Sequence, residues 1–319
     1  MRNRDSRIDT LRVLGTFLII LAHSLPPVVI TNLRTFDVVL LVFISGISFK
    51  KSNVKGEFFK YLHKRVKKLV IPTYLLLAII FLLTTVISYI FEVSSPFTFD
   101  IIISSFLFYN KGIGFIWIVK VYLYTAILLY SIRKVNKNWY TVSMFFIHLL
   151  YIFLNNYLNI NNDFYNSYFI DIIPYGVIAI LGYELENRKN IFPSLFIGVL
   201  CLFLFSQFHN GINFNPNNYK YPPSIYYLSY GLLVSLVLYR FIPSVNHKVI
   251  FWLSKNSYSL YLIHIFYIFS LNFLETKLVV IKIWYVKLFL LLLLSILTLI
   301  CLLKIKSKVG IDSEIIKKD

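Results

Sequence analysis

LVIPTYLLLAIIFLLTTVISYIF occupies Leu69–Phe91 and contains no charged residue. A helix that crosses the hydrocarbon core of a bilayer needs about 20 consecutive apolar residues, and this run supplies them. The rest of the 319-residue chain has the same character, with 58% hydrophobic residues, 14% charged residues and a mean hydropathy of +0.72. Soluble chains are about half apolar and about a quarter charged. The sequence therefore predicts an integral membrane protein rather than a soluble domain.

The apolar runs predict an all-α polytopic protein with about ten transmembrane helices. They form a single domain over residues 1–303, followed by a basic tail over 304–319. The second span is short, and its Ser45-Gly46 pair suggests close helix packing. Phe97–Tyr109 is also apolar but too short to span, so we expect it to be interfacial or re-entrant. The predicted spans are Leu11–Ile30, Thr35–Phe49, Leu69–Phe91, Phe115–Ile132, Trp139–Leu158, Tyr168–Leu185, Ile191–Phe208, Ile225–Ile242, Ser257–Leu274 and Ile283–Leu303.

The basic residues divide unequally between the two ends of these spans. With ten spans, 24 Lys and Arg residues fall on the side of both termini and six on the other side. The positive-inside rule then places both termini in the cytoplasm and the chain in the cell membrane, among membrane lipids. The formal net charge of +18 is thereby explained by topology, and we expect no nucleic-acid partner.

The N-terminus also has features of a cleavable signal peptide. Basic residues precede the apolar run Val13–Leu21, and the small residues Ala22 and Ser24 follow it. However, Asp9 and Arg12 interrupt the start of the apolar segment, and the next predicted helix follows almost at once. We therefore expect the segment to be retained as the first transmembrane helix.

Three ionisable residues of this first segment are candidates for the chemistry: Asp9, Arg12 and His23. Such residues are costly inside a membrane and are therefore commonly functional. Arg12 and His23 are about three helical turns apart, on one face and roughly 16 Å apart along the axis, and Asp9 can pair with Arg12. A cation at the cytoplasmic edge and a proton-transfer group deeper in the membrane suit a long phosphorylated donor. The alternative is a structural ion pair with a hydrogen-bonded core histidine.

The same segment, RIDTLRVLGTFLIILAH from Arg7 to His23, resembles the opening signature of the acyltransferase-3 family. The family consists of bacterial integral-membrane acyltransferases, mostly O-acetyltransferases of surface polysaccharides. Other segments resemble the family's second helix, the basic loop before its third helix, its late Ser-Tyr…Tyr-Leu-x-His helix and its His-x-Trp segment. They are, in that order, FDVVLLVFISG (Phe36–Gly46), YLHKRVKKLVIPTY (Tyr61–Tyr74), SYSLYLIH (Ser257–His264) and FIW (Phe115–Trp117).

The resemblance implies a transferase of the inner membrane that moves an acetyl group from cytoplasmic acetyl-CoA, the co-substrate, to a hydroxyl of a cell-surface or lipid-linked glycan. It implies catalytic roles for His23 and Arg12, with Asp9 holding the arginine. The basic loop Lys50–Lys68 would contact the phosphates of coenzyme A, or else serve only topology and attraction to anionic lipid. The implied acetyl-CoA-binding residues are Arg12, Ser45, Arg65 and Lys68, and the implied acceptor-binding residues are Trp117, Tyr258, Tyr261 and His264.

Three positions depart from the family pattern. Lys68 stands where a second Arg is usual, which keeps the charge but loses a planar bidentate donor. Phe115 replaces the histidine before Trp117, so we expect no catalytic role there. Asp37 stands where one branch of the family has histidine, and its carboxylate can orient His23 and favour the protonated imidazole. The alternative for Asp37 is a solvated residue at a helix N-terminus.

Other functions are compatible with parts of the sequence. A polysaccharide transporter or flippase without acyl chemistry would share the spans, buried ions and polar outer loops, but the sequence shows no pseudo-repeat. A regulatory membrane sensor without activity and the membrane-bound O-acyltransferase superfamily are further alternatives, although the residues of that superfamily do not match. The sequence has no closely spaced histidine pair and no cysteine cluster, so it predicts no metal site, and it has no phosphate-binding glycine loop that would indicate nucleotide hydrolysis. Acetyl transfer can be direct or pass through an acetylated enzyme, and the sequence predicts no oligomeric state.

Overall fold

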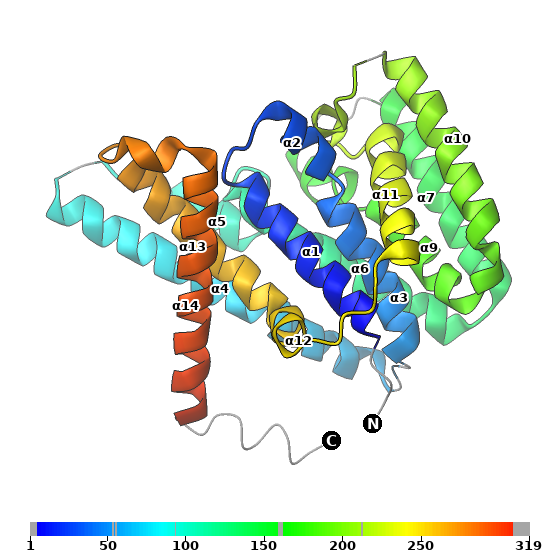
Figure 1. Cartoon of the computed structure of the whole chain (residues 1–319), viewed down its shortest axis with the longest axis horizontal. Coiled ribbons are helices and arrows are strands. Elements are labelled where there is room, and N and C mark those ends of the chain that lie inside the picture. The colour runs from blue at the N-terminus through cyan, green and yellow to red at the C-terminus, as the bar shows by residue number, and fades with distance from the viewer. Residues whose placement is uncertain are drawn as a thin grey trace.

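The computed structural model describes residues 5–308 except 53, 55, 93, 159–161 and 212, and over this part of the chain it contains helices and no strand (Figure 1). The predicted all-α class is confirmed. The α-helices are α1 (Ser6–Ala22), α2 (Val28–Arg34), α3 (Asp37–Ser52), α4 (Phe58–Ile90), α5 (Phe99–Phe106), α6 (Trp117–Val135), α7 (Asn138–Leu158), α8 (Asp163–Tyr165), α9 (Tyr175–Asn187), α10 (Phe192–Asn210), α11 (Ile225–Phe241), α12 (Lys248–Lys255), α13 (Ser257–Glu275) and α14 (Trp284–Lys308). Short 3₁₀ or π segments are η1 (Gly114–Ile116), η2 (Asn166–Ile170), η3 (Lys189–Ile191), η4 (Pro216–Tyr219) and η5 (Val279–Lys282).

Seven helical stretches of the described chain are long and apolar enough to cross a membrane. α7 and α11 contribute shorter apolar helices, and α1 has 17 residues with Asp9 and Arg12 near its start. Each of the ten predicted spans therefore corresponds to a helix, although seven rather than ten meet the length and composition requirement. The chain is a multi-pass membrane protein. The seven stretches are Val28–Ser52, Phe58–Ile90, Gly114–Val135, Asp163–Asn187, Lys189–Asn210, Ser257–Glu275 and Trp284–Lys308.

The first span ends earlier than the sequence predicts. α1 stops at Ala22 instead of continuing to Ile30, and His23 is its C-cap. Leu25 then adopts a left-handed backbone with φ 59°, and Pro26-Pro27 follows. Proline has no N–H to continue the helical hydrogen bonds, so the chain turns here and restarts as α2. His23 therefore lies at the end of a helix rather than in its interior.

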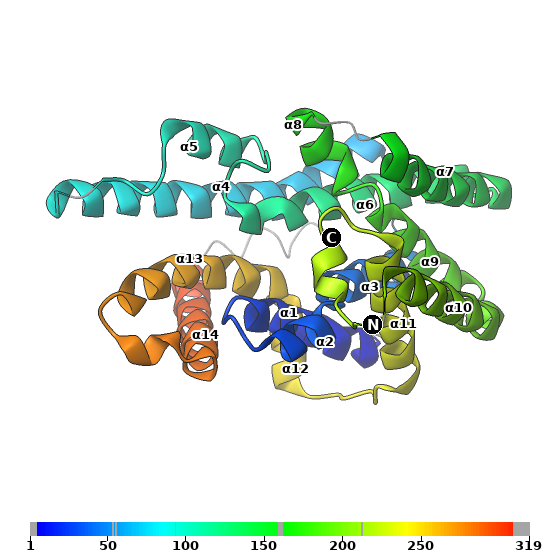
Figure 2. The ribbon, with the colours of Figure 1, turned by 90° about the horizontal axis from the view of Figure 1, so that it is seen from above.

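α3 lies at the centre of the molecule and packs against α1, α9 and α11 (Figures 1 and 2). Glycines let α3 and α9 approach closely. A Cβ on Gly46 would lie 2.2 Å from the carbonyl oxygen of Ala179, and a Cβ on Gly182 would lie 2.2 Å from the carbonyl oxygen of Phe43. Small residues at such crossings favour helix association in a membrane, where lipid is as apolar as the side chains. The close packing predicted at Gly46 is confirmed.

The longest helix, α4, and the C-terminal helices α13 and α14 lie outside this centre. α4 runs along one side with α5 beside it, and α13 packs against α14 (Figure 2). α5 has eight residues, so the segment predicted to be interfacial or re-entrant is too short to cross a membrane. α14 continues through Lys308, so residues 304–308 of the predicted tail are helical, and the rest of that tail lies outside the described residues.

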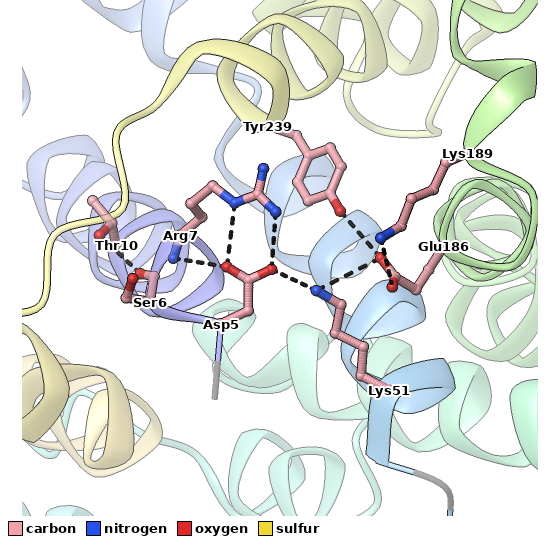
Figure 3. A network of polar contacts seen from close by, with 8 residues as sticks. All are labelled: Asp5, Ser6, Arg7, Thr10, Lys51, Glu186, Lys189 and Tyr239. Atoms are coloured by element: carbon pink, nitrogen blue, oxygen red, sulfur yellow. Dashed lines mark hydrogen bonds and ion pairs between the residues drawn. The ribbon is translucent and has the colours of Figure 1, made fainter. Parts of the chain in front are cut away.

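A network of polar contacts fixes the start of α1 against α3, α9 and α11 (Figure 3). Asp5 is the N-cap of α1, and its carboxylate accepts a hydrogen bond from the backbone N–H of Arg7 (3.1 Å). The same carboxylate pairs with the Arg7 guanidinium and with Lys51 of α3. Lys51 also lies 3.6 Å from Glu186 of α9, which accepts from the Tyr239 hydroxyl of α11 (3.1 Å). The helix that carries the candidate catalytic residues is thus anchored at its first turn.

Candidate active site

Arg12 is held in place by side chains from two other helices. Its Nη1 donates to Ser254 Oγ of α12 (3.0 Å), and its Nη2 donates to Ser48 Oγ of α3 (3.2 Å). Asp9 lies one turn earlier, with Oδ1 3.6 Å from Arg12 Nη1, and accepts a hydrogen bond from Ser254 Oγ (2.6 Å). The predicted Asp9–Arg12 pair is present, and Ser254 joins its two members. The guanidinium is therefore oriented by the protein itself.

A cavity of about 410 Å³ has Arg12 in its wall, and we call it the Arg12 cavity. The other residues predicted to bind acetyl-CoA also line it: Ser45, Arg65 and Lys68. Lys255 adds a further cation to the wall. Among the described residues no group of three or more His, Cys, Asp or Glu is arranged to hold a metal ion. Arg12, Arg65, Lys68 and Lys255 together form a cluster of cations in the cavity wall. Such a cluster suits a phosphorylated ligand.

Arg65 and Lys68 lie on a helix, whereas the sequence predicts the loop Lys50–Lys68. α4 begins at Phe58, well before the apolar run. Lys and Arg are good helix formers, so the basic segment extends the spanning helix instead of preceding it. The i,i+3 spacing puts both cations on one helix face. Arg65 is further fixed because its Nε donates to the Tyr61 hydroxyl (3.1 Å).

A second cavity, of about 480 Å³, has His23 in its wall, and we call it the His23 cavity. Three other predicted site residues line it: Asp37, Trp117 and Tyr261. The ring of His23 meets the ring of Phe115 edge to face, with centroids 4.8 Å apart. At the position where the family resemblance expects a histidine, an apolar ring therefore packs against His23.

The two cavities share part of their walls. Ile19 of α1, Ile118 of α6 and Tyr261 of α13 line both, and we call these three residues the shared wall. The Tyr261 hydroxyl donates to the carbonyl of Phe115, which ties α13 to the segment before α6. A ligand in the Arg12 cavity and a ligand in the His23 cavity would thus approach each other across these three side chains.

The predicted acceptor-binding residues of α13 lie in different places. Tyr258 lines the Arg12 cavity, and its hydroxyl donates to the carbonyl of Leu69 (2.8 Å), so it is placed with the predicted donor-binding residues. Tyr261 belongs to the shared wall. His264 is fully buried, with its ring centroid 5.4 Å from that of His23. Its Nδ1 is hydrogen-bonded to the carbonyl of Tyr261, and its Nε2 has no partner among the described residues. His264 therefore lies next to the His23 ring without lining either cavity.

Asp37 is buried, with 1% of its surface exposed, so its interpretation as a solvated helix N-terminus is wrong. Its Oδ2 accepts from Arg34 Nη1 (2.5 Å), and its Oδ1 accepts from the backbone N–H of Val38 (2.7 Å). Lys220 Nζ lies 3.6 Å from Oδ1. The carboxylate is thus bound by cations in the cavity that it shares with His23. An orienting role toward His23 stays a prediction.

Three residues of the site escape sequence reasoning: Arg34, Lys220 and Ser254. Arg34 and Asp37 have the i,i+3 spacing of an ion pair, which is a weak signal because many surface pairs share it. Lys220 is the one Lys or Arg in the Asn- and Tyr-rich segment His209–Tyr227. Ser254 carries no sequence signal, because it meets Arg12 only through tertiary packing.

Comparison with known proteins identifies the family of the chain. A family model described as an acyltransferase domain matches residues 5–305. No curated protein and no solved structure matches the chain. The match extends over nearly the whole chain and contains every residue of both cavities. The chain therefore belongs to the acyltransferase-3 family and is a multi-pass membrane acyltransferase.

Proposed function

We propose that the protein is an O-acetyltransferase that moves an acetyl group from cytoplasmic acetyl-CoA to a hydroxyl of a cell-surface or lipid-linked glycan. The observation that carries the proposal is the pair of cavities, one lined by cations and one by His23, that meet at the shared wall. A donor in one cavity and an acceptor in the other bring a thioester and a hydroxyl together there. Holding two reactants in this way removes much of the entropic barrier to their reaction.

The distribution of basic residues supports the direction of transfer. By the positive-inside rule, the side of the ten predicted spans with 24 Lys and Arg residues faces the cytoplasm and the side with six faces outward. In this orientation, which suits the inner membrane of a bacterium, the Arg12 cavity lies on the cytoplasmic side. Arg12, Arg65 and Lys68 then contact the phosphates of coenzyme A through charge-assisted hydrogen bonds.

His23 acts as the general base in this scheme. Its ring nitrogen takes the proton of the acceptor hydroxyl while the hydroxyl oxygen attacks the thioester carbonyl. The new C–O bond forms, the C–S bond breaks, and the thiolate of coenzyme A leaves and takes the proton back from His23. In the alternative relay, His23 attacks the thioester first and holds the acetyl group until the acceptor arrives. Release of coenzyme A in a single turnover without acceptor distinguishes the relay from direct transfer.

A polysaccharide flippase without acyl chemistry is less well supported. The matching family model is an acyltransferase domain. A flippase also needs one continuous pathway that passes a whole saccharide, whereas the Arg12 cavity and the His23 cavity share only Ile19, Ile118 and Tyr261 among their lining residues.

The test uses the full-length protein in vesicles with radiolabelled acetyl-CoA and a membrane glycan fraction. His23→Gln removes the base, and His209→Gln replaces an exposed histidine at the end of α10 as the matched control. We expect His23→Gln to lower acetyl transfer by about 100-fold or more and His209→Gln to leave it unchanged. Full transfer by His23→Gln would show that His23 is not the base. Mass spectrometry of the labelled glycan then identifies the acceptor.

A further inference from the structure

Two cations share one carboxylate in the His23 cavity. Asp37 pairs with Arg34 Nη1 at 2.5 Å and lies 3.6 Å from Lys220 Nζ. All three residues line the cavity and are buried, with 7% (Arg34), 8% (Lys220) and 1% (Asp37) of their surface exposed. This corner of the cavity therefore carries one surplus positive charge. A buried charge without compensation is costly, so a ligand that brings a negative charge is favoured there.

Arg34 also has an unused hydrogen-bond donor. Its Nη1 is bound to Asp37, but its Nε is buried and has no hydrogen-bond partner among the described residues. A buried donor that stays unpaired costs free energy. The planar guanidinium matches the geometry of carboxylate and phosphate oxygens. The free Nε is thus a second observation, independent of the charge count, that points to an oxyanion.

The other charged residues of the cavity are already balanced. Lys120 Nζ donates to Asn110 Oδ1 (3.1 Å) and to the carbonyl of Ser167 (2.6 Å). Asn110 Nδ2 in turn donates to Asp171 Oδ2 (2.7 Å), so its amide bridges the cation and the carboxylate. The positive charge of Lys120 and the negative charge of Asp171 therefore leave no surplus charge in this part of the cavity. The unbalanced charge is therefore confined to the corner around Asp37.

Aromatic rings flank the cations of that corner. Lys220 Nζ lies 5.9 Å from the ring centroid of Trp117 and 5.6 Å from that of Tyr221. The two rings contact each other edge to face at 5.3 Å, and both line the His23 cavity. Flat aromatic faces of this kind pack against the apolar face of a sugar ring. A sugar ring and a negatively charged substituent on it would therefore find adjoining partners.

We infer that the His23 cavity binds an anionic acceptor, a saccharide that carries one oxyanion close to the sugar ring that presents its hydroxyl. The side chains of Lys220 and Arg34 bind the oxyanion, and the sugar ring packs on Trp117 and Tyr221. The oxyanion is a sugar carboxylate or a phosphate on the sugar, which share this chemistry. That this saccharide is the acetyl acceptor rests on the proposed function, whereas the binding of an anionic saccharide does not.

The test measures binding in the absence of acetyl-CoA. Full-length protein in nanodiscs is titrated with methyl glucuronoside, with glucose 6-phosphate and with neutral methyl glucoside. Lys220→Met keeps a long unbranched side chain and removes the charge. Lys111→Met is the matched control, because it removes an exposed cation that pairs with Asp163. In the wild type and in the control we expect an anionic sugar to bind about tenfold more tightly than methyl glucoside, and in Lys220→Met we expect this advantage to be lost.

Tighter binding of the glucuronoside supports the inference with a carboxylate as the source, and tighter binding of glucose 6-phosphate supports it with a phosphate. Equal binding of all three sugars to the wild type overturns the inference, whether or not the protein transfers acetyl groups. The comparison of the three sugars uses the wild type alone, so it does not require any variant to fold. The protein can also prefer anionic sugars in a way that requires Lys220 and yet acetylate no glycan. That result supports the anion site and overturns the proposed function instead.

Discussion

The rings of His23 and His264 lie with their centroids 5.4 Å apart, although one residue caps α1 and the other belongs to α13. The carbonyl of Tyr261 can only accept a hydrogen bond, so His264 Nδ1 carries the hydrogen and Nε2 keeps its lone pair. That nitrogen is buried and has no partner within the described structure. A His23 ring that has taken a proton from the acceptor would be a hydrogen-bond donor whose ring lies next to this unpartnered acceptor. We therefore regard His264 as a positioning residue for His23.

Replacement of His264 tests this relationship. His264→Phe keeps an aromatic ring but removes the acceptor nitrogen, so we expect kcat to fall about tenfold to 100-fold while the KM for acetyl-CoA stays unchanged. His264→Gln places an amide near the position of Nε2 and should restore part of the loss. Steady-state kinetics of purified protein measure both effects. Equal losses in the two variants would show that His264 contributes packing alone.

Arg12 is expected to act mainly on donor binding. Its guanidinium lies in the wall of the Arg12 cavity and is oriented by Ser254 and Ser48. A charge-assisted hydrogen bond contributes about 1.5–3 kcal/mol, so Arg12→Gln should raise the KM for acetyl-CoA about tenfold to 100-fold. Arg188→Gln, which removes a partly exposed arginine paired with Glu184, is the control and should leave KM unchanged. An unchanged KM in Arg12→Gln would remove Arg12 from the donor site.

The spacing within one helix predicts the Asp9–Arg12 ion pair, because a helix has a fixed rise and twist. Hydropathy likewise predicts which segments are helical. It does not predict that α1 ends at Ala22. A hydropathy average counts apolar residues and takes no account of Pro26-Pro27, which cannot continue the backbone hydrogen bonds of the helix. The predicted loop Lys50–Lys68 is wrong for a related reason, since cations can continue a helix past its apolar part.

Contacts between distant segments could not be predicted from the sequence. Ser254 Oγ donates to Asp9 Oδ1 across 245 positions of the chain, and Lys220 lies close to Asp37 although it belongs to a distant segment. No repeat or spacing relates these positions. They meet because α12 packs on α1 and because η4, just before Lys220, packs on α2, just before Asp37. The sequence therefore predicts the residues of the candidate site within single helices but not the cross-helix partners that orient them.

The close approach of α3 and α9 makes Gly46 sensitive to any side chain. A Cβ there would lie 2.2 Å from the carbonyl oxygen of Ala179 and 2.9 Å from the backbone nitrogen of Tyr183, and backbone atoms cannot rotate away. Overpacking of this kind costs about 1–3 kcal/mol or more, so Gly46→Ala should lower Tm and the yield of folded protein. Gly198→Ala in α10 is the control because a Cβ there meets nothing within 4 Å, and we expect Tm to hold or rise. A wild-type Tm for Gly46→Ala would contradict the packing described.

Ionisation of Asp5 is expected to stabilise the first turn of α1. Burial alone would raise the pKa of this carboxyl, but hydrogen bonds from Lys51 and Arg7 outweigh that effect and lower the pKa from 3.8 to about 2. Because the folded-state pKa is the lower one, the stabilisation is present above pH 3.8 and is lost as the pH falls toward 2. Water screens this partly exposed group, so we expect a contribution of about 1 kcal/mol.

The Asp5 contribution can be isolated by comparing variants, because other carboxylates also titrate in acid. Asp5→Asn should have a lower Tm than the wild type at pH 7, and the difference between the two proteins should shrink between pH 3.8 and pH 2 as Asp5 becomes protonated in the wild type. Asp163→Asn removes an ion pair with Lys111 whose side chains are 63% and 60% exposed, so its Tm should match the wild type. If Asp5→Asn and Asp163→Asn have the same Tm at pH 7, the polar network around Asp5 does not anchor α1.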